Sequence, residues 1–261
     1  MAKAIQLCPG DRIRIIRKIN KANNIILLTF SCLLFLSQGV FAVERKTSSL
    51  LLKRTNVPIY SVRVVNLYPH DTDTFTQGIF YHEGFLYESS GLYGKSFLKK
   101  TQLKSGKTLK KVELPVKYFA EGIALHNGKI YQLTWKENKC FVYDLKNIKK
   151  TASFAYHTQG WGITSDGKNL IMSDGSAVLY FLDPAVFQII RKIKVSDGNI
   201  LIDNINELEF VEGEIWANIF MEDYVARISP DTGKVLGWID LRVLYSYLKD
   251  IGSIDVLNGI A

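Results

Sequence analysis

The sequence is poor in the residues that build metal centres and disulfide frameworks. It contains three cysteines and four histidines in 261 residues. Cys8 and Cys32 lie in an N-terminal leader, so Cys140 is left without a partner for an intrachain disulfide. Cys140 stands in an apolar run, which favours a buried structural thiol over a nucleophile. The four histidines show no metal-ligand spacing. We therefore expect no metal ion and no other cofactor.

Two common enzyme motifs are also missing. The segment 91–96 (GLYGKS) ends like a phosphate-binding loop, but that loop needs a glycine where Ser89 stands, and a helix after it. The pair Gly175-Ser176 is not set in the Gly-x-Ser-x-Gly context of a hydrolase nucleophile. These absences give no support to a nucleotide-binding loop or a serine hydrolase.

The first 42 residues are typical of a secretory signal peptide. A basic stretch over 12–21 precedes the apolar run 25–36, and Val40-Phe41-Ala42 places small residues at positions −3 and −1 of a cleavage site. We predict cleavage after Ala42, a linker over residues 43–58 and a secreted or periplasmic protein with no membrane attachment after cleavage. An uncleaved N-terminal anchor is the alternative. A lipoprotein processed at Cys32 fits less well, because the three residues before it do not match the expected small-residue pattern.

The positive charge gives no reason to expect a nucleic-acid partner. Residues 1–42 carry six basic residues and one acidic residue, so +5 of the net charge of +8 belongs to the leader and only +3 to the rest. Lysine pairs such as Lys99-Lys100 and Lys110-Lys111 are expected on solvated outer edges of a sheet.

A short phrase recurs five times along the chain. Its middle residues are 44, 40, 45 and 52 positions apart, and a period of about 40–50 residues indicates repeated supersecondary units. The five copies are Gln77-Gly78-Ile79, Glu121-Gly122-Ile123, Trp161-Gly162-Ile163, Asn206-Glu207-Leu208 and Asn258-Gly259-Ile260. Because side chains alternate along a strand, the first and third residues of each copy face the same side. The repeat therefore predicts that the first residues of the five copies converge on one axis.

Each of the first four phrases is followed by a polar residue and a glycine between two β-rich runs, which is a hairpin signal. These pairs are Glu83-Gly84, Asn127-Gly128, Asp166-Gly167 and Glu212-Gly213. Two further strands follow around a second turn, as at Asp183-Pro184. Four antiparallel strands in about 45 residues form a β-propeller blade. A solenoid is the weaker alternative, and the alternating Val, Ile, Tyr, Phe and Thr residues exclude a helical repeat.

We therefore predict an all-β fold, a five-bladed β-propeller over residues 59–261. The run 60–67 resembles the outer strand of a blade and is expected to supply the fourth strand of the last blade. The fifth phrase lies at the end of the sequence, so that blade is expected to be incomplete, without its second and third strands, and the chain to be truncated. An open ring of this kind would expose strand edges.

Glu121 is the best candidate for a catalytic group in the axial ring. Its carboxyl lies on an inner strand among aromatic residues, with no obvious cation nearby, so burial is expected to raise its pKa toward the range useful for general acid–base catalysis. The alternative is that Glu121 only pairs with a backbone group or a lysine inside the channel.

Several ordered motifs resemble the plant-type and bacterial glutaminyl-peptide cyclotransferases (glutaminyl cyclases). The resemblance covers about residues 59–261. It is carried by Phe75-Thr76-Gln77-Gly78, the run 87–94 (YESSGLYG), Gln132-Leu133-Thr134-Trp135, Gly160-Trp161-Gly162, Ser173-Asp174-Gly175-Ser176, the run 206–209 (NELE) and Trp238-Ile239-Asp240-Leu241. It implies a five-bladed propeller and a metal-free reaction. In that reaction the α-amine of an N-terminal glutamine attacks its own side-chain amide and releases ammonia, so the implied partners are peptides or proteins with N-terminal glutamine. We expect a monomer.

The resemblance also implies roles for individual residues. Glu121 matches the acid–base residue, and Gln77 and Asn206 match polar groups that hold the amide and its oxyanion. The aromatic walls of the substrate pocket are matched by Phe75, Phe119, Trp135, Trp161 and Phe220, although core packing alone would also explain aromatic residues at these places.

Three departures from the family pattern bear on activity. Gln159 stands where the family usually has Glu, Phe220 stands where it usually has Trp, and a family lysine would lie beyond Ala261. Two other function classes therefore stay open. One is a propeller lactonase that holds Ca²⁺ through Glu121, Asn206 and Asn258, although Ca²⁺ prefers more carboxylates than this. The other is a propeller that binds peptides without turning them over.

Overall fold

The computed structural model describes residues 2–4, 29–31, 52, 54–247 and 256–261. The described residues form an all-β protein with one 3-10 helix, η1 (Arg242–Tyr247). No helix in the described part is long and apolar enough to cross a bilayer. Most of the predicted leader and linker lies outside the described residues.

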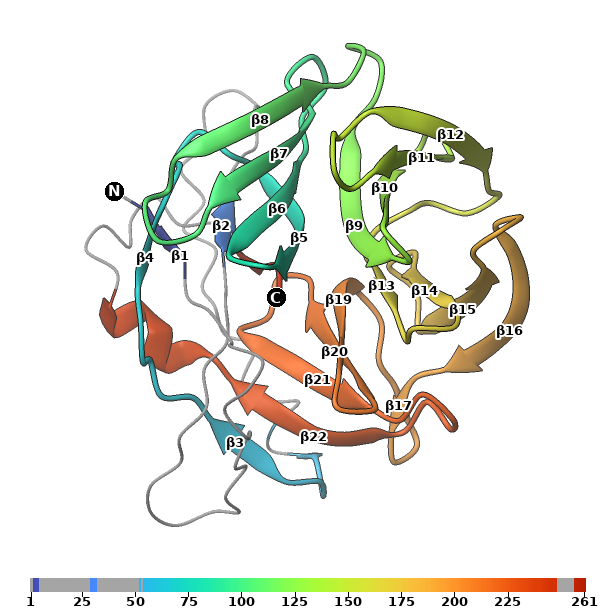
Figure 1. Cartoon of the computed structure of the whole chain (residues 1–261). Coiled ribbons are helices and arrows are strands. Elements are labelled where there is room, and N and C mark those ends of the chain that lie inside the picture. The colour runs from blue at the N-terminus through green and yellow to red at the C-terminus, as the bar shows by residue number, and fades with distance from the viewer. Residues whose placement is uncertain (1, 5–28, 32–51, 53, 248–255) are drawn as a thin grey trace, which may run out of the picture.

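Four antiparallel sheets are arranged side by side around a common centre, as the blades of a propeller (Figure 1). Blade 1 consists of β5 (Thr76–His82), β6 (Phe85–Ser90), β7 (Phe97–Gln102) and β8 (Thr108–Glu113). Blade 2 consists of β9 (Ala120–His126), β10 (Lys129–Thr134), β11 (Lys139–Asp144) and β12 (Lys150–Ala155). Blade 3 consists of β13 (Ile163–Ser165), β14 (Leu170–Ser173), β15 (Val178–Asp183) and β16 (Gln188–Lys194). Blade 4 consists of β19 (Ile205–Val211), β20 (Glu214–Ile219), β21 (Tyr224–Ile228) and β22 (Val235–Asp240). A small hairpin of β17 (Ser196–Asp197) and β18 (Ile200–Leu201) connects blades 3 and 4.

The hairpin prediction from the polar–glycine pairs is confirmed. In three of the pairs both residues have positive φ, for example 48° at Glu83 and 87° at Gly84. Positive φ at both central residues is the requirement of a type I′ turn, whose twist matches that of the flanking strands. The local sequence therefore determines the register of the first two strands of these blades.

The inner strands β5, β9, β13 and β19 lie next to one another, and the recurring glycines explain how closely they approach. A Cβ atom on Gly122 would lie 2.5 Å from the carbonyl oxygen of Trp161, and one on Gly78 would lie 2.7 Å from the backbone nitrogen of Ile123. The backbone nitrogen of Gly122 donates a hydrogen bond to the same Trp161 oxygen at 2.7 Å. The glycines are thus needed because neighbouring blades touch through their backbones.

The prediction that every phrase lies on a strand is wrong for the third copy, and in the fifth copy only Asn258 lies on a strand. β13 begins only at Ile163, after Trp161 and Gly162. These two residues still exchange backbone hydrogen bonds of 3.0 Å with Ser173, so the pairing with blade 3 continues through them. Their contacts with blade 2 and blade 4 hold them next to the axis.

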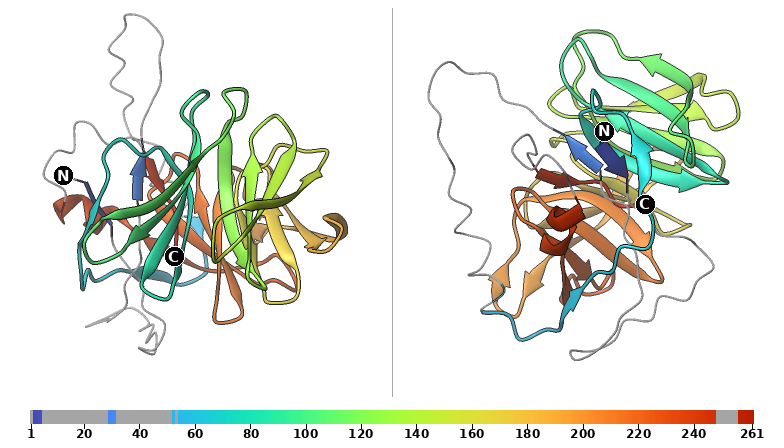
Figure 2. Two further views of the ribbon diagram at one scale, coloured as in Figure 1. Left: turned by 45° about the horizontal axis from the view of Figure 1, so that its top comes forward. Right: turned by 90° about the vertical axis from the view of Figure 1, so that its left-hand side faces the viewer.

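The fifth phrase lies between blade 4 and blade 1. Its first residue, Asn258, is the last residue of β23 (Val256–Asn258). β23 pairs with β2 (Thr29–Ser31), while β1 (Ala2–Ala4) pairs with β4 (Tyr68–His70). β1 and β2 belong to the predicted signal peptide. Figure 2 shows β1, β2 and β4 on one side of the ring, and β2 and β23 both contact β5.

The run 60–67 does not form the outer strand of a fifth blade, contrary to the sequence prediction. Only β3 (Ile59–Ser61) is a strand, and it adds in parallel to β22 as a fifth strand of blade 4. The carbonyl oxygen of Pro58 accepts a hydrogen bond of 2.9 Å from the backbone nitrogen of Trp238, which begins this pairing. β3 therefore covers the edge that β22 would otherwise expose.

The apolar core lies between adjacent blades. One cluster joins blades 3 and 4 around Trp238, whose side chain is fully buried and whose indole nitrogen donates to Asp197 at 2.9 Å. A second joins blades 2 and 3, and a third joins blades 1 and 2. Cys140 is buried in the second cluster as a free thiol, as predicted. These clusters bury both faces of blades 2 and 3 and one face each of blades 1 and 4, which fixes the inner strands and the residues that they carry.

Candidate functional site

Glu121 lies near the start of β9 and is 7% exposed. No described residue donates a hydrogen bond to its carboxyl group. Burial, and secondarily the negative charge of Glu137, raise the pKa of Glu121 well above its ordinary value. The direction predicted from the sequence is therefore confirmed. A carboxyl group with a raised pKa keeps its proton to higher pH than an exposed one and can donate it to a leaving group.

Glu137 was not found by sequence reasoning, yet it shapes the surroundings of Glu121. It lies in the loop between β10 and β11, where its Oε1 accepts a hydrogen bond of 2.7 Å from the Tyr93 hydroxyl. Its Oε2 accepts one of 3.2 Å from the backbone nitrogen of Phe119, two residues before Glu121. Burial, followed by the hydrogen bond and charge of Glu137, raises the pKa of Tyr93 to about 12. The only sequence signal for Glu137 is its place two residues after Trp135.

Aromatic rings from blades 1 and 2 form one side of the candidate pocket. The Phe119 ring lies at the centre, with its centroid 6.1 Å from that of Phe75, 5.5 Å from Tyr93 and 5.6 Å from Trp135. All three contacts are edge-to-face, which is a favourable arrangement of aromatic quadrupoles. Phe75, Phe119 and Trp135 are only partly buried, so they are wall residues rather than core residues.

Trp161 and Phe220 form the opposite side, with ring centroids 5.7 Å apart. Phe220 is 39% exposed. Gln159 connects the two sides: its Oε1 accepts a hydrogen bond from the Trp135 indole at 2.7 Å and from the Trp161 indole at 3.1 Å. The five aromatic residues predicted from the sequence therefore belong to one structure at one end of the ring.

A chain of amide groups runs along the inner strands. The Asn206 amide donates to Asn258 Oδ1 at 3.2 Å, and Asn258 donates in turn to Gln77 Oε1 at 3.3 Å and to the Thr76 carbonyl at 3.1 Å. Gln77, Asn206 and Asn258 are 9%, 5% and 2% exposed. Because Gln77 accepts through its oxygen, its amide nitrogen is oriented as a donor, and it bonds to no described residue. This donor could stabilise a developing negative charge on a substrate oxygen.

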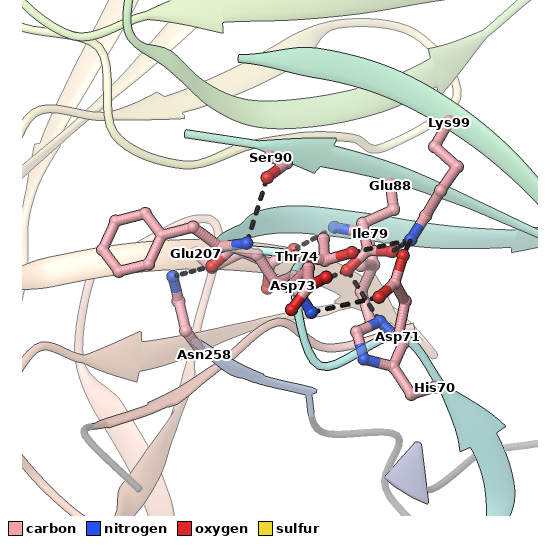
Figure 3. Close-up of polar contacts among 12 residues, drawn as sticks. His70, Asp71, Asp73, Thr74, Ile79, Glu88, Ser90, Lys99, Glu207 and Asn258 are labelled. Atoms are coloured by element: carbon pink, nitrogen blue, oxygen red, sulfur yellow. Dashed lines mark hydrogen bonds and ion pairs between the residues drawn. The ribbon is translucent and has the colours of Figure 1, made fainter. Parts of the chain in front are cut away.

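Glu207 stands where the other four phrases have glycine, and its side chain reaches Ile79 on the neighbouring strand β5 (Figure 3). It is 1% exposed, and its two oxygens accept backbone hydrogen bonds from Ile79 at 3.4 Å and Ile260 at 2.9 Å. Burial, and then the charge of Glu209, raise the pKa of Glu207 well above its usual value. Glu207 thus joins blade 4 to blade 1 and to the fifth phrase.

A buried ionic cluster holds the segment that carries Phe75 and Gln77 (Figure 3). The Glu88 carboxylate is fully buried and lies 2.8 Å from His70 Nε2 and 3.1 Å from Lys99 Nζ. It also accepts a hydrogen bond from the Thr76 hydroxyl. Burial alone would raise the pKa of Glu88, but the charge and hydrogen bond of His70 and the charge of Lys99 outweigh it and lower this pKa to about 2. Lys99 is 3% exposed, so the prediction of a solvated Lys99 is wrong: its partner on the neighbouring strand takes it into the blade.

Phe75 itself is held through its backbone. Its nitrogen donates to the Ser90 hydroxyl at 3.0 Å, and its carbonyl accepts from Gly91 at 2.8 Å. A Cβ on Gly91 would lie 2.5 Å from the Phe119 ring, so glycine is required for the ring to pack there. The ionic cluster and these bonds together place the first wall of the pocket.

The described residues contain no group of three or more His, Cys, Asp or Glu side chains placed to hold a metal ion. Of the three calcium ligands considered above, the Asn258 oxygen is engaged by Asn206. The geometry that is present suits proton transfer and amide binding beside a cluster of aromatic side chains.

Comparisons with known proteins agree on one family. Residues 33–261 match the family model described as glutamine cyclotransferase. A curated glutaminyl-peptide cyclotransferase of Arabidopsis thaliana is 42% identical over 207 residues, which are 78% of this chain and 65% of that protein. The crystal structure of the Myxococcus xanthus glutaminyl cyclase superposes with a TM-score of 0.72 at 32% identity, over 77% of this chain and 86% of that one. The chain thus spans slightly less than two thirds of its curated relative.

Proposed function

The chain belongs to the glutamine cyclotransferase family, and from this premise we propose that it is a glutaminyl-peptide cyclotransferase. It converts the N-terminal glutamine of peptides or proteins to pyroglutamate and releases ammonia. The observation that carries the proposal is Glu121, a buried carboxyl group with a raised pKa and no hydrogen-bond donor among the described residues, beside a wall of partly exposed aromatic rings.

The reaction balances around this one group. The neutral α-amine attacks the side-chain carbonyl carbon, which forms the ring C–N bond and turns the carbonyl oxygen into an oxyanion. Protonated Glu121 gives its proton to the former amide nitrogen, the oxyanion re-forms the carbonyl, and the C–N bond to that nitrogen breaks so that ammonia leaves. The carboxylate then takes the surplus proton from the attacking amine, so Glu121 ends in its starting state. Such proton transfer contributes about 10²–10⁴-fold to the rate.

The surroundings supply the remaining requirements. The Gln77 amide nitrogen is a donor for the oxyanion, because its oxygen is occupied by Asn258. Aromatic walls on both sides hold the glutamine in a folded conformation, and closing a ring from such a conformation avoids much of the entropic cost. The substrate amine has an ordinary pKa of about 8, so a useful fraction is neutral without assistance.

The proposal also covers metal dependence, oligomeric state, blade number and export. We propose that the reaction needs no metal ion and that the protein works as a monomer. We also propose that the fifth phrase marks a fifth blade position in the ring, in keeping with its place between blades 4 and 1. The basic and apolar segments before Ala42 support export to the periplasm or the exterior, and the N-terminal residue of the exported protein would test cleavage after Ala42.

The proposal is tested by mass spectrometry of a short peptide with N-terminal glutamine, incubated with the full chain and a metal chelator. The expected product has lost one ammonia. The same peptide with an acetylated amine should not react, because it has no nucleophile. If the free peptide binds without losing ammonia, the protein is a peptide-binding propeller. If turnover requires added Ca²⁺, the metal-free mechanism is wrong.

A further inference from the structure

Gln159 presents an unused hydrogen-bond donor at the rim of the aromatic pocket. It lies in the loop between β12 and β13, and its side chain is exposed. Its single amide oxygen accepts both indole hydrogen bonds, from Trp135 at 2.7 Å and from Trp161 at 3.1 Å. The amide nitrogen therefore points away from both indoles, and it bonds to no described residue. A neutral donor is thus held in a fixed orientation between the two walls.

An exposed positive charge lies on the same wall. The Lys136 ammonium lies 3.8 Å from the centroid of the Trp135 ring, and its side chain is exposed. The neighbouring Glu137 is partly buried, and both of its oxygens are occupied by the Tyr93 hydroxyl and the Phe119 nitrogen. The rim around Trp135 therefore offers an ammonium and an amide donor, and both favour an acceptor or an anion.

We propose that Gln159 determines specificity for the residue that follows the N-terminal glutamine of the substrate. This inference rests on the proposed function: when glutamine fills the pocket, the second residue must leave past the rim formed by Trp135, Gln159 and Trp161. A neutral residue at position 159 places no negative charge between the two indoles that would offset Lys136. The rim then favours an acidic second residue and disfavours a basic one.

The experiment compares the full-length wild type with Gln159→Glu and Lys136→Gln. The glutamate variant keeps an acceptor for each indole and adds one negative charge. The assay measures kcat/KM for three tripeptides that begin Gln-Glu, Gln-Lys and Gln-Ala. The ratio of the first value to the second should fall about 3- to 10-fold in Gln159→Glu, because one charge is added at roughly 6–10 Å in a solvated site. Lys136→Gln should move the ratio in the same direction, and both changes should shrink at high salt.

Other results would overturn the inference. An equal change for all three peptides in Gln159→Glu would mean that Gln159 only supports the walls, and an unchanged ratio would remove it from specificity. If the wild type releases no ammonia from any peptide, the proposed function fails separately. The preference is then measured as binding, through quenching of tryptophan fluorescence in Glu121→Gln with and without Gln159→Glu. A ratio of Kd values that does not respond to the added charge contradicts the inference.

Discussion

Replacing Glu137 with Gln is expected to move the alkaline limb of the pH–rate profile to lower pH. Glu137 accepts the backbone hydrogen bond of Phe119, so its charge lies close to Glu121 and contributes to the raised pKa of that group. A unit charge at about 6–8 Å, with an effective dielectric constant of about 20–40, contributes about 1–3 kcal/mol. This energy corresponds to about one to two pKa units.

The direction of the shift follows from the protonation state of Glu121 that takes part in the reaction. Glu121 must carry a proton when ammonia leaves, so activity is lost as the pH rises through its pKa in the folded protein. Without the Glu137 charge this pKa falls toward the usual value but stays raised by burial. The alkaline limb should therefore shift down by about one pH unit, while the acid limb, which reports deprotonation of the substrate amine, should stay in place.

The assay is kcat/KM for a glutamine dipeptide across the pH range, for the wild type, Glu137→Gln and Tyr93→Phe. The phenylalanine variant removes the hydroxyl that bonds Glu137 but keeps the Glu137 charge. It should leave the limb within about 0.3 units. An alkaline limb that is unmoved in Glu137→Gln, or that moves as far in Tyr93→Phe, would refute electrostatic control of Glu121 by Glu137.

Three further predictions concern stability. Glu88→Gln should lower the free energy of unfolding by about 3–5 kcal/mol, because it removes the buried anion of His70 and Lys99 and leaves Lys99 only the longer contact with Asp71 at 3.6 Å. In the wild type the lowered pKa of Glu88 means that its stabilisation is present above about pH 4.5 and is lost as the pH falls toward 2. Denaturant titrations at several pH values would show both effects, and a variant as stable as the wild type would contradict the role of the cluster. Burial raises the pKa of Glu209 to about 8, so folding favours its protonated form, and the stability that this form provides is lost between about pH 4.5 and 8. Glu209→Gln should reduce the fall of Tm with pH over this range. A Tm that falls as steeply in the variant as in the wild type would contradict this prediction. Gly122→Ala should destabilise the fold by about 1–3 kcal/mol, because the new methyl group would meet the Trp161 carbonyl at 2.5 Å, and an unchanged Tm would mean that the blades can separate without cost.

Local patterns predicted much of the fold. The polar–glycine pairs define hairpins, and the spacing of the repeated phrase locates the inner strands of blades 1, 2 and 4. The failures have a common physical cause. The parallel addition of β3 to blade 4 is decided by which sheet edge is free in three dimensions, and the run 60–67 carries no signal for that choice. Lys99 looks like a solvated lysine in the sequence because its anion, Glu88, lies on the neighbouring strand and not beside it along the chain.

The candidate site likewise contains some residues that the sequence pattern indicates and others that only three-dimensional contacts reveal. Glu121, Gln77 and Asn206 share one position of the repeat, whereas the roles of Gln77, Asn206 and the aromatic residues were implied by the resemblance to the cyclotransferase family. Glu137 and Tyr93 lie outside the repeat and act through a loop. Glu207 was visible as an exception to the glycine rule, but its function is apparent only when its oxygens are seen to accept hydrogen bonds from Ile79 and Ile260.

The most direct test of the account is the rate of ammonia release from a glutamine dipeptide by the wild type and by Glu121→Gln, with chelator present and with both proteins shown to be folded by their thermal unfolding. Glutamine keeps the size of the side chain but cannot transfer a proton. We expect steady, chelator-insensitive release by the wild type and a loss of at least about 10²-fold in the variant. Release by the variant at the wild-type rate would contradict the assignment of Glu121 as the proton-transfer group.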